Sequence, residues 1–336
     1  MIQLFQILIS SLIPVLIFQI VYHHSQNLKL SCWGGMGFAC YPASISLSTL
    51  YMSETLFSFV LLLVFYLSLH VRRINTYLVP LALTCSVYIR PVSILILPLV
   101  YLRMYVNGKK TEYVKRSSVL FLSVLILLAP WIYRNYQKLG ALVFISTNFG
   151  INLYIGNHNG ATGRYTEDSF FKEHPVNKFG EIESSKIFKK EAVDFITANP
   201  FKTIYLFLKK LCYLSFQDRS TVYQSFELNK GKRFSWWQRL LAVGNNAYYL
   251  IFFLLFIGCL GFGIWGIWKG RTIQTTVIIY PLPVIVFLLS HSMFFAEDRF
   301  KFPVTSLMII STLLFINEFT ISKPRNEFKK QTQAFV

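Results

Sequence analysis

Long uninterrupted apolar runs are the feature that most constrains the fold of this chain. Runs of about 20 apolar residues match the thickness of the hydrocarbon layer of a bilayer, and nearly all the charged residues fall in the gaps between the runs. The 336 residues are 54% hydrophobic and only 14% charged, which is more apolar surface than a soluble core uses. The sequence therefore predicts an integral membrane protein whose main solvent is lipid.

The apolar runs predict about nine transmembrane helices. The second run is the weakest, because its glycines and its proline suit a helix packed closely on its neighbours better than one exposed to lipid. Two short runs meet at Arg90 and Pro91, where the proline favours a break. The runs lie at about 2–22, 33–51, 54–70, 76–89, 91–106, 117–133, 245–268, 275–291 and 303–318.

The positive charge follows the loops between the runs. A net charge of +18 would indicate nucleic-acid binding if it formed a basic face on a folded surface, but here it gathers in short segments between apolar runs. Short loops that face the cytoplasm carry such an excess. We therefore expect no nucleic-acid partner, an external N-terminus and a cytoplasmic C-terminus. The basic segments are Arg72 and Arg73, Lys109 to Arg116, Lys269 and Arg271, and residues 323–330.

This threading divides the chain into four parts. Residues 1–133 are expected to form an N-terminal membrane domain of about six spans, 134–244 an external loop domain, 245–318 a C-terminal membrane domain of about three spans, and 319–336 a basic cytoplasmic tail. The external part is itself basic, but loops longer than about 60 residues escape the charge rule. The predicted fold class is an all-α polytopic membrane protein with a mixed α/β external loop domain.

The external loop domain has a pattern of its own. Residues 140–165 are rich in Gly and Asn around β-prone residues such as Leu142 to Ser146, which predicts a structured loop. Residues 184–199 have a helical pattern that Pro200 interrupts. Residues 201–216 then combine apolar residues with lysines, as expected of an amphipathic helix lying on the membrane surface.

Cysteine and histidine indicate neither a disulfide framework nor a metal site. The five cysteines are an odd number, lack a C-x-x-C spacing and lie mostly within apolar runs. The adjacent His23 and His24 have no carboxylate near them in the sequence, which favours a solvated turn at the interface. No metal ion and no cofactor are predicted.

Two charged residues at membrane depth call for an explanation, because charge is costly there. Glu54 begins the third run. It is either an acid that stabilises the N-terminus of a helix or a carboxylate with a functional role, and the sequence favours neither interpretation over the other. Arg90 either extends to the lipid headgroups or binds a phosphate, for which a guanidinium is well suited. Both residues are expected at the external end of a span.

Two further motifs are expected on the same side of the membrane. Residues 150–163 hold Gly and Asn at a density that exposes backbone N–H groups and carboxamides, which suits either a turn-rich loop or the binding of sugar hydroxyls or a diphosphate. Residues 297–303 begin the last run, either as an interfacial anchor or as a pair of cations for a lipid phosphate.

Taken in order, these motifs resemble the bacterial membrane glycosyltransferases of the GT-C superfamily, in the branch that includes protein mannosyltransferases and the aminoarabinose transferase of lipid A. Each motif alone is weak, and six in the right order make the resemblance fairly specific. It extends from Gln6 to about Phe315. The motifs are Tyr41-Pro42, Ser53-Glu54-Thr55-Leu56-Phe57, Arg90-Pro91, Pro130-Trp131 with Arg134-Asn135, Gly156-Asn157, and Asp298-Arg299-Phe300 with Pro303.

The resemblance implies a multi-pass enzyme of the bacterial inner membrane. Such an enzyme takes a sugar from a polyprenyl-phosphate carrier and passes it, on the external face, to a lipid, glycan or protein acceptor. By that similarity Arg90, Arg134, Arg299 and Lys301 are candidates for binding the carrier phosphate, and Asn157 for binding the sugar or the acceptor. Arginine suits an anionic leaving group at a lipid interface because it stays charged.

The chain departs from the family at its start. Family members begin with an additional span and an external loop that carries an acidic residue, which acts as general base or positions the acceptor. Both are missing before Met1, so we expect a truncated and inactive relative or a chain that recruits another acid. Glu54 and Asp298 are the weak catalytic candidates, beside the external acids Asp168 and Glu297. The alternative is a non-enzymatic polytopic protein, such as a flippase or transporter for lipid-linked sugars or an assembly subunit.

Overall fold

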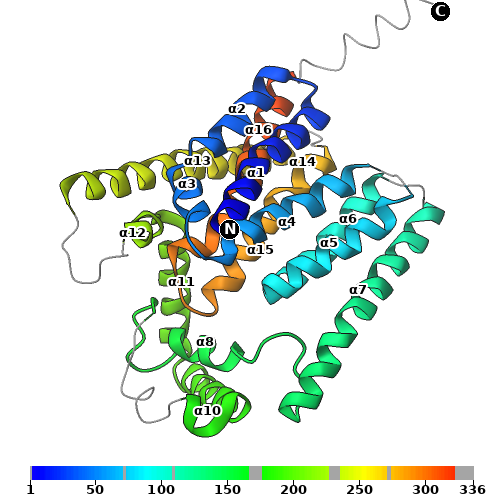
Figure 1. Ribbon diagram of the computed structural model, residues 1–336. Coiled ribbons are helices and arrows are strands. Elements are labelled where there is room, and N and C mark those ends of the chain that lie inside the picture. Colours follow the sequence, from blue (N-terminus) through cyan, green and yellow to red (C-terminus); the bar gives the residue numbers. More distant parts are fainter. Residues whose placement is uncertain are drawn as a thin grey trace, which may run out of the picture.

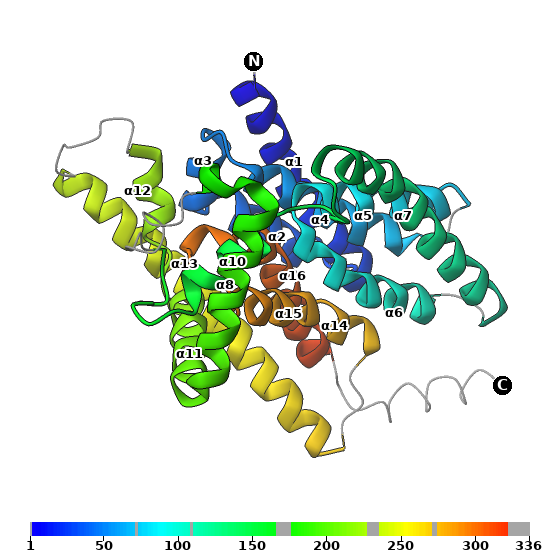
Figure 2. The ribbon, with the colours of Figure 1, turned by 90° about the horizontal axis from the view of Figure 1, so that it is seen from below.

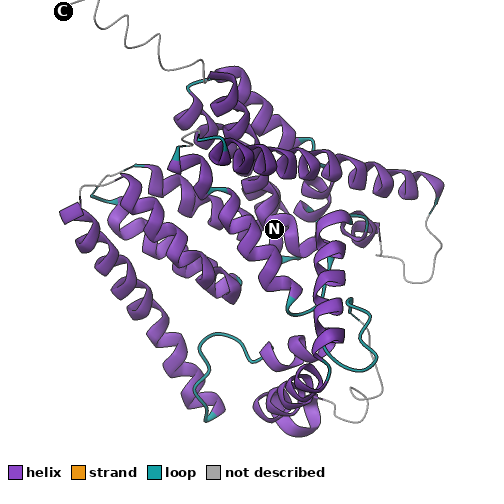
Figure 3. Ribbon diagram, turned by 180° about the vertical axis from the view of Figure 1, so that it is seen from behind, coloured by secondary structure: helices purple, strands orange, loops and turns teal. Residues whose placement is uncertain are grey.

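The computed structural model describes residues 2–70, 73–107, 110–165, 176–226, 235–270 and 274–321. Within these ranges every regular element is a helix (Figure 3). The prediction of a mixed α/β external domain is therefore wrong for the described part. Leu142 to Ser146 form an irregular loop with a bend at Phe144 and Ile145, because a single five-residue stretch of high β-propensity has no second strand to pair with. Several residues named above lie outside the described ranges: Arg72, Lys109, Asp168, Arg271 and residues 322–336.

Four described helices are long and apolar enough to cross a membrane. They are α1 (Ile2–Ser25), most of α7 (Lys110–Leu139), α13 (Trp236–Trp268), and the 3-10 turn η2 (Asp298–Lys301) with α16 (Phe302–Ile321). A fifth span is counted if α3 (Pro42–Ser48) and α4 (Ser53–Leu69), which are bent by 113°, form one broken span. The chain thus has the helices of a multi-pass membrane protein, and the expected nine spans are corrected to four or five.

The remaining apolar runs fail as spans because the helices in them are short. One of them, Asn75–Ile89, has 15 residues and measures about 22 Å, against a hydrocarbon layer about 30 Å thick. Prolines break the others, as expected at Pro91 and also at Pro42 and Pro281. These shorter elements are α2 (Leu28–Ala39), α5 (Asn75–Ile89), η1 (Pro91–Ile96), α6 (Leu97–Asn107), α14 (Thr275–Ile279) and α15 (Pro281–Ser292).

The helix α16 forms the centre of the bundle. It packs against α1, α2, α4, α13 and α15 (Figure 1), and most of its side chains are buried, including the polar Ser306 and Thr312. Both hydroxyls donate to backbone carbonyls of their own helix, which satisfies them without a partner from another helix. Gly34 lets α2 approach closely, because a Cβ atom there would lie 2.8 Å from Cδ1 of Leu313.

Four helices between α7 and α13 gather at one end of the bundle. They are α8 (Phe149–Gly156), α10 (Val176–Ala198), α11 (Pro200–Phe216) and α12 (Ser220–Phe226), and Figure 2 shows α8, α10 and α11 side by side. Gly150 allows α8 to lie on α10, because an added Cβ would lie 1.9 Å from the carbonyl oxygen of Ser185. The break before Pro200 is confirmed, and the domain boundaries expected after residues 133 and 244 fall inside the helices α7 and α13.

Candidate functional site

The segment Glu297 to Lys301 brings two groups of charged side chains to one end of the bundle. It forms the 3-10 turn η2, which has about three residues per turn, so Asp298 and Lys301 share one face while Arg299 points elsewhere. We call the group around Arg299 the arginine cluster, formed by Glu54, Arg90, Glu297 and Arg299. We call the other the aspartate cluster, formed by Asp218, Asp298, Lys301, Arg164 and Tyr41.

In the arginine cluster, two guanidinium groups share one carboxylate. Nη2 of Arg90 lies 2.6 Å from Oε1 of Glu54, and Nε of Arg299 lies 3.6 Å from the same oxygen. Arg299 also lies 2.5 Å from Oε2 of Glu297. The cluster holds two positive and two negative groups, so it is electrically neutral as a whole.

Aromatic rings hold the two guanidinium groups independently of Glu54. The ring of Phe300 lies 5.5 Å from Cζ of Arg90 and 5.8 Å from Cζ of Arg299, and Phe57 lies 6.0 Å from Cζ of Arg90. The side chains of Arg90 and Arg299 are 16% and 28% exposed, whereas that of Glu54 is 3% exposed. The cations therefore face the outside of the site and the carboxylate lies beneath them.

In the aspartate cluster, Asp218 is saturated with partners. Thr221 and the Nδ2 amide of Asn245 donate to its two carboxylate oxygens at 3.0 and 2.8 Å, and Tyr41 donates its hydroxyl as well. Lys301, which is fully buried, lies 3.6 Å from the same carboxylate and 4.2 Å from the centre of the Tyr249 ring. Burial and the charge of Asp218 raise the pKa of Tyr41 well above its ordinary value, so the phenol keeps its proton and donates.

Asp298 joins the aspartate cluster to helix α12. Its Oδ2 accepts hydrogen bonds of 2.9 Å from the backbone N–H groups of Arg219 and Ser220, which begin α12. Its Oδ1 lies 3.7 Å from a guanidinium nitrogen of Arg164, whose side chain is 44% exposed and lies over the ring of Tyr213. Arg164 is therefore the accessible cation of this cluster, whereas Lys301 is enclosed.

Asn157 belongs to a third polar contact, beside the aspartate cluster. Its Nδ2 donates to the carbonyl oxygens of Leu153 and Met293, both at 2.8 Å, and its Oδ1 accepts from Nζ of Lys210 at 3.1 Å. Lys210 also donates to the carbonyl of Gly156 at 3.2 Å. Burial lowers the pKa of Lys210 from 10.5 to about 8, since no carboxylate among the described residues pairs with its ammonium group. In this conformation Asn157 is 2% exposed and ties α8 to α11 and α15.

Arg134 contacts neither the arginine cluster nor the aspartate cluster among the described residues. It lies on α7, with its guanidinium 5.1 Å from the Trp131 ring, and it donates to Oδ1 of Asn135 at 3.1 Å. None of its contacts to described residues reaches the arginine or the aspartate cluster. The structure thus brings Glu54, Arg90 and Arg299 together, places Asp298 and Lys301 on the adjoining face of η2, and leaves Asn157 and Arg134 in surroundings of their own.

Sequence reasoning missed Asp218, Arg164 and Lys210. Lys210 had a visible signal, because it occupies the buried stripe of α11 four residues after Leu206 and four before Leu214. Asp218 and Arg164 had none, since their partners lie tens of residues away along the chain. The part of the chain that the structure describes contains no group of three His, Cys, Asp or Glu side chains placed to hold a metal ion.

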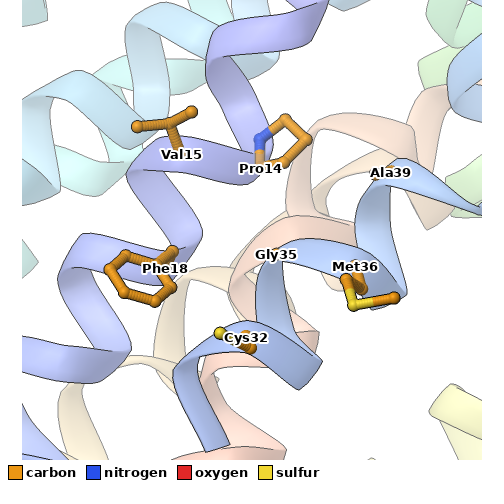
Figure 4. A pocket seen from close by; sticks show the side chains of 7 residues that line it. All are labelled: Pro14, Val15, Phe18, Cys32, Gly35, Met36 and Ala39. Atoms are coloured by element: carbon orange, nitrogen blue, oxygen red, sulfur yellow. The ribbon is translucent and has the colours of Figure 1, made fainter. Parts of the chain in front are cut away.

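A hollow of about 310 Å³ lies on the outside of the bundle, between α1 and α2 (Figure 4). Pro14, Phe18, Gly35 and Met36 are among the residues that line it, and all of the lining is apolar or contains sulfur. It offers no charged group for a phosphate or sugar, so the two charged clusters are the better candidates for a site.

Comparison with known proteins returned no family model that matches the chain and no curated protein or solved structure with significant similarity to it. The described part of the chain is helical, with four or five helices long and apolar enough to span a membrane. Its charged side chains form a candidate site at one end of the helix bundle. The resemblance to the GT-C glycosyltransferases therefore stays a hypothesis.

Proposed function

We propose that this chain is a membrane transferase that moves a sugar from a polyprenyl-phosphate carrier to a lipid, glycan or protein acceptor on the external face of a bacterial inner membrane. The observation that carries the proposal is the arginine cluster. Arg90 and Arg299 share Glu54 and remain partly exposed at the end of apolar helices. Partly exposed arginines at the membrane surface are well suited to bind the phosphate of a lipid carrier.

The chemistry of the leaving group supports the same assignment. Sugar transfer from a phosphate carrier develops negative charge on the phosphate oxygen that leaves. Guanidinium groups that are already in position stabilise this charge without reorganising, which is how preorganised sites lower a barrier. The cation–π contacts with Phe300 supply this positioning for both arginines.

A direct test is transfer by the purified protein in proteoliposomes, with a radiolabelled polyprenyl-phosphate sugar as the donor. We expect product with the natural sequence and a loss of about 100-fold or more with Arg299→Ala, because that change removes a cation from the developing charge. Lys186→Ala is the matched control, since Lys186 lies on α10 in an exposed pair with Glu183. Absence of transfer with every donor and acceptor class tried would reject the proposal.

One observation favours the second candidate, a flippase for lipid-linked sugars. Every carboxylate of the two clusters has a cationic partner within 4 Å, whereas a general base must be released from such a partner before it takes a proton. A protein that only moves a phosphate headgroup needs no such base. Movement of the labelled lipid across sealed vesicles without chemical change would support this candidate over the transferase.

A further inference from the structure

The four carboxylates of the two clusters differ in what holds them. Asp298 accepts two backbone N–H bonds that begin α12, and Asp218 accepts from a tyrosine, a threonine and an asparagine. Glu54 is held only by the guanidinium groups of Arg90 and Arg299, and both contact the same oxygen, Oε1. Among the described residues, no donor contacts its Oε2. Glu54 can therefore lose its partners without breaking any backbone hydrogen bond.

The two arginines are fixed by other contacts and have donors to spare. The ring of Phe300 lies within 6 Å of both guanidinium groups, so they stay in place when Glu54 is no longer their partner. A guanidinium has five N–H donors, and Arg90 uses Nη2 for Glu54 while its buried Nε donates no hydrogen bond within the described part of the chain. A phosphate ester fits these unused donors better than a single carboxylate oxygen does.

We propose that Glu54 is a displaceable counterion: a phosphate ester takes over Arg90 and Arg299, and the released carboxylate accepts the proton of the acceptor hydroxyl. This inference rests on the proposed transferase function for its second half. The net charge of the arginine cluster supports the displacement of Glu54. The arginine cluster carries no net charge, so an added phosphate makes it negative, and the phosphate and the Glu54 carboxylate repel each other.

The step balances in atoms and charge. The acceptor oxygen forms a bond to the anomeric carbon, and the bond from that carbon to the phosphate oxygen breaks. The electron pair of the broken bond stays on the phosphate, which Arg90 and Arg299 hold, and the proton of the acceptor hydroxyl passes to Glu54. The phosphate gains negative charge as it leaves, and Arg90 and Arg299, no longer paired with Glu54, compensate this charge.

The binding half of the inference is tested with the full-length protein in nanodiscs, without any turnover. The probes are inorganic phosphate and a fluorescent polyprenyl phosphate, measured with the natural sequence, Glu54→Gln and Glu183→Gln. Removing a displaceable counterion should make binding about tenfold tighter in Glu54→Gln, because the phosphate no longer competes with a negative charge for the arginines. Glu183→Gln, a change in an exposed pair on α10, should bind as the natural sequence does.

The two probes separate the two sources of a phosphate ester. Tighter binding of polyprenyl phosphate alone assigns the site to a lipid carrier, and tighter binding of both probes to the same degree assigns it to the phosphate group itself. Binding of both probes that is unchanged or weaker in Glu54→Gln would overturn the exchange.

Turnover tests the second half. In the proteoliposome assay, Glu54→Gln should retain donor binding while transfer falls about 100-fold or more, the usual effect of removing a general base. Full transfer by Glu54→Gln would overturn the assignment of the base. If the natural sequence transfers nothing, the proposed function fails, whereas the binding measurements still decide whether Glu54 exchanges with phosphate.

Discussion

Nζ of Lys210 lies 3.1 Å from Oδ1 of Asn157, and within the described part of the chain no carboxylate accompanies this buried ammonium group. The contact joins α11 to the end of α8, and through Met293 to the end of α15. It therefore anchors the start of the loop that leads to Arg164 in the aspartate cluster. Because burial lowers the pKa of Lys210 to about 8, the contact can be probed by pH as well as by substitution.

The first prediction concerns the pH dependence that Lys210 gives to stability. Its pKa in the folded protein is about 8, below the ordinary 10.5, so the unfolded chain binds the proton more tightly. The cost of burying the charged form is present below pH 8 and is relieved between about pH 8 and pH 10.5, so stability should rise across this window by up to about 3 kcal/mol. Thermal unfolding in detergent between pH 7 and pH 10 measures it.

Lys210→Met should lose this rise in stability, whereas Lys186→Met, a change at an exposed lysine, should keep it. The difference between the two variants isolates Lys210 from other groups that titrate at alkaline pH. Equal pH slopes in both variants would show that Lys210 does not carry the effect.

The second prediction concerns Asn157. Asn157→Ala removes one of the acceptors of Lys210 and the donor to the carbonyls of Leu153 and Met293, so three buried hydrogen bonds are lost. Lys210 keeps the carbonyls of Gly156 and Met293. We expect a loss of about 2–4 kcal/mol in stability, seen as a lower melting temperature. The neighbouring Asn159 has an exposed side chain, so Asn159→Ala should change little. If the sugar-binding role implied by the family resemblance is correct, transfer should fall more than stability alone explains.

The third prediction compares two glycines. A Cβ atom at Gly156 would lie 1.6 Å from the carbonyl oxygen of Phe294, whereas one at Gly244 has no heavy atom within 4 Å. Gly156→Ala should therefore force α8 away from the 293–296 segment and abolish folded protein in detergent, as judged by size-exclusion chromatography. Gly244→Ala lies inside helix α13 and should stabilise by about 0.5–1 kcal/mol. Well-folded Gly156→Ala would contradict the close packing of α8.

The sequence was informative wherever local chemistry decides the outcome. The break between α10 and α11 follows from Pro200, whereas α13 begins at Trp236, well before the expected start of its apolar run at residue 245. The number of spans was not accessible in this way, because apolar runs of similar length became long helices in α1 and short, proline-broken ones at Pro91 and Pro281. Packing against neighbours, which a single run does not encode, determines where such helices end.

In the candidate site, too, some features follow from the local sequence and others depend on the fold. The charged residues at helix ends, Glu54, Arg90 and Arg299, were visible because charge is rare in apolar surroundings. Their shared use of one carboxylate oxygen depends on the positions of α4, α5 and η2 in the fold. Asp218 gave no signal, since its partner Lys301 lies far along the chain. The aspartate cluster therefore became apparent only with the structure.

The fourth prediction concerns the buried pair of Asp218 and Lys301. Lys301→Met leaves the Asp218 carboxylate buried without its cation and should cost about 3–5 kcal/mol. In the double variant with Asp218→Asn the uncompensated charge is gone, so part of that loss should return. A double-mutant cycle of unfolding free energies measures the coupling. Effects that simply add would show that the two residues do not act as a pair.

The last prediction concerns the face of the membrane on which the site lies. The carbonyl of Gly163 accepts a 2.9 Å hydrogen bond from the backbone N–H of Ala296, so the 156–165 loop and the 297–301 turn must emerge on one side. Lys269 lies at the far end of α13, whose 33 residues measure about 50 Å, longer than a bilayer is thick.

In a cysteine-free background, the fold predicts that Gly160→Cys and Glu297→Cys react from the same side, and the proposed function predicts that an impermeant maleimide added outside the cell labels both. Lys269→Cys should then react only after the membrane is opened. The assay separates two questions. Labelling of Gly160→Cys and Glu297→Cys from opposite sides would contradict the fold itself. Labelling of both from the cytoplasm alone would leave the fold intact and remove the arginines from the outer leaflet, where a carrier phosphate on the external face has to reach them.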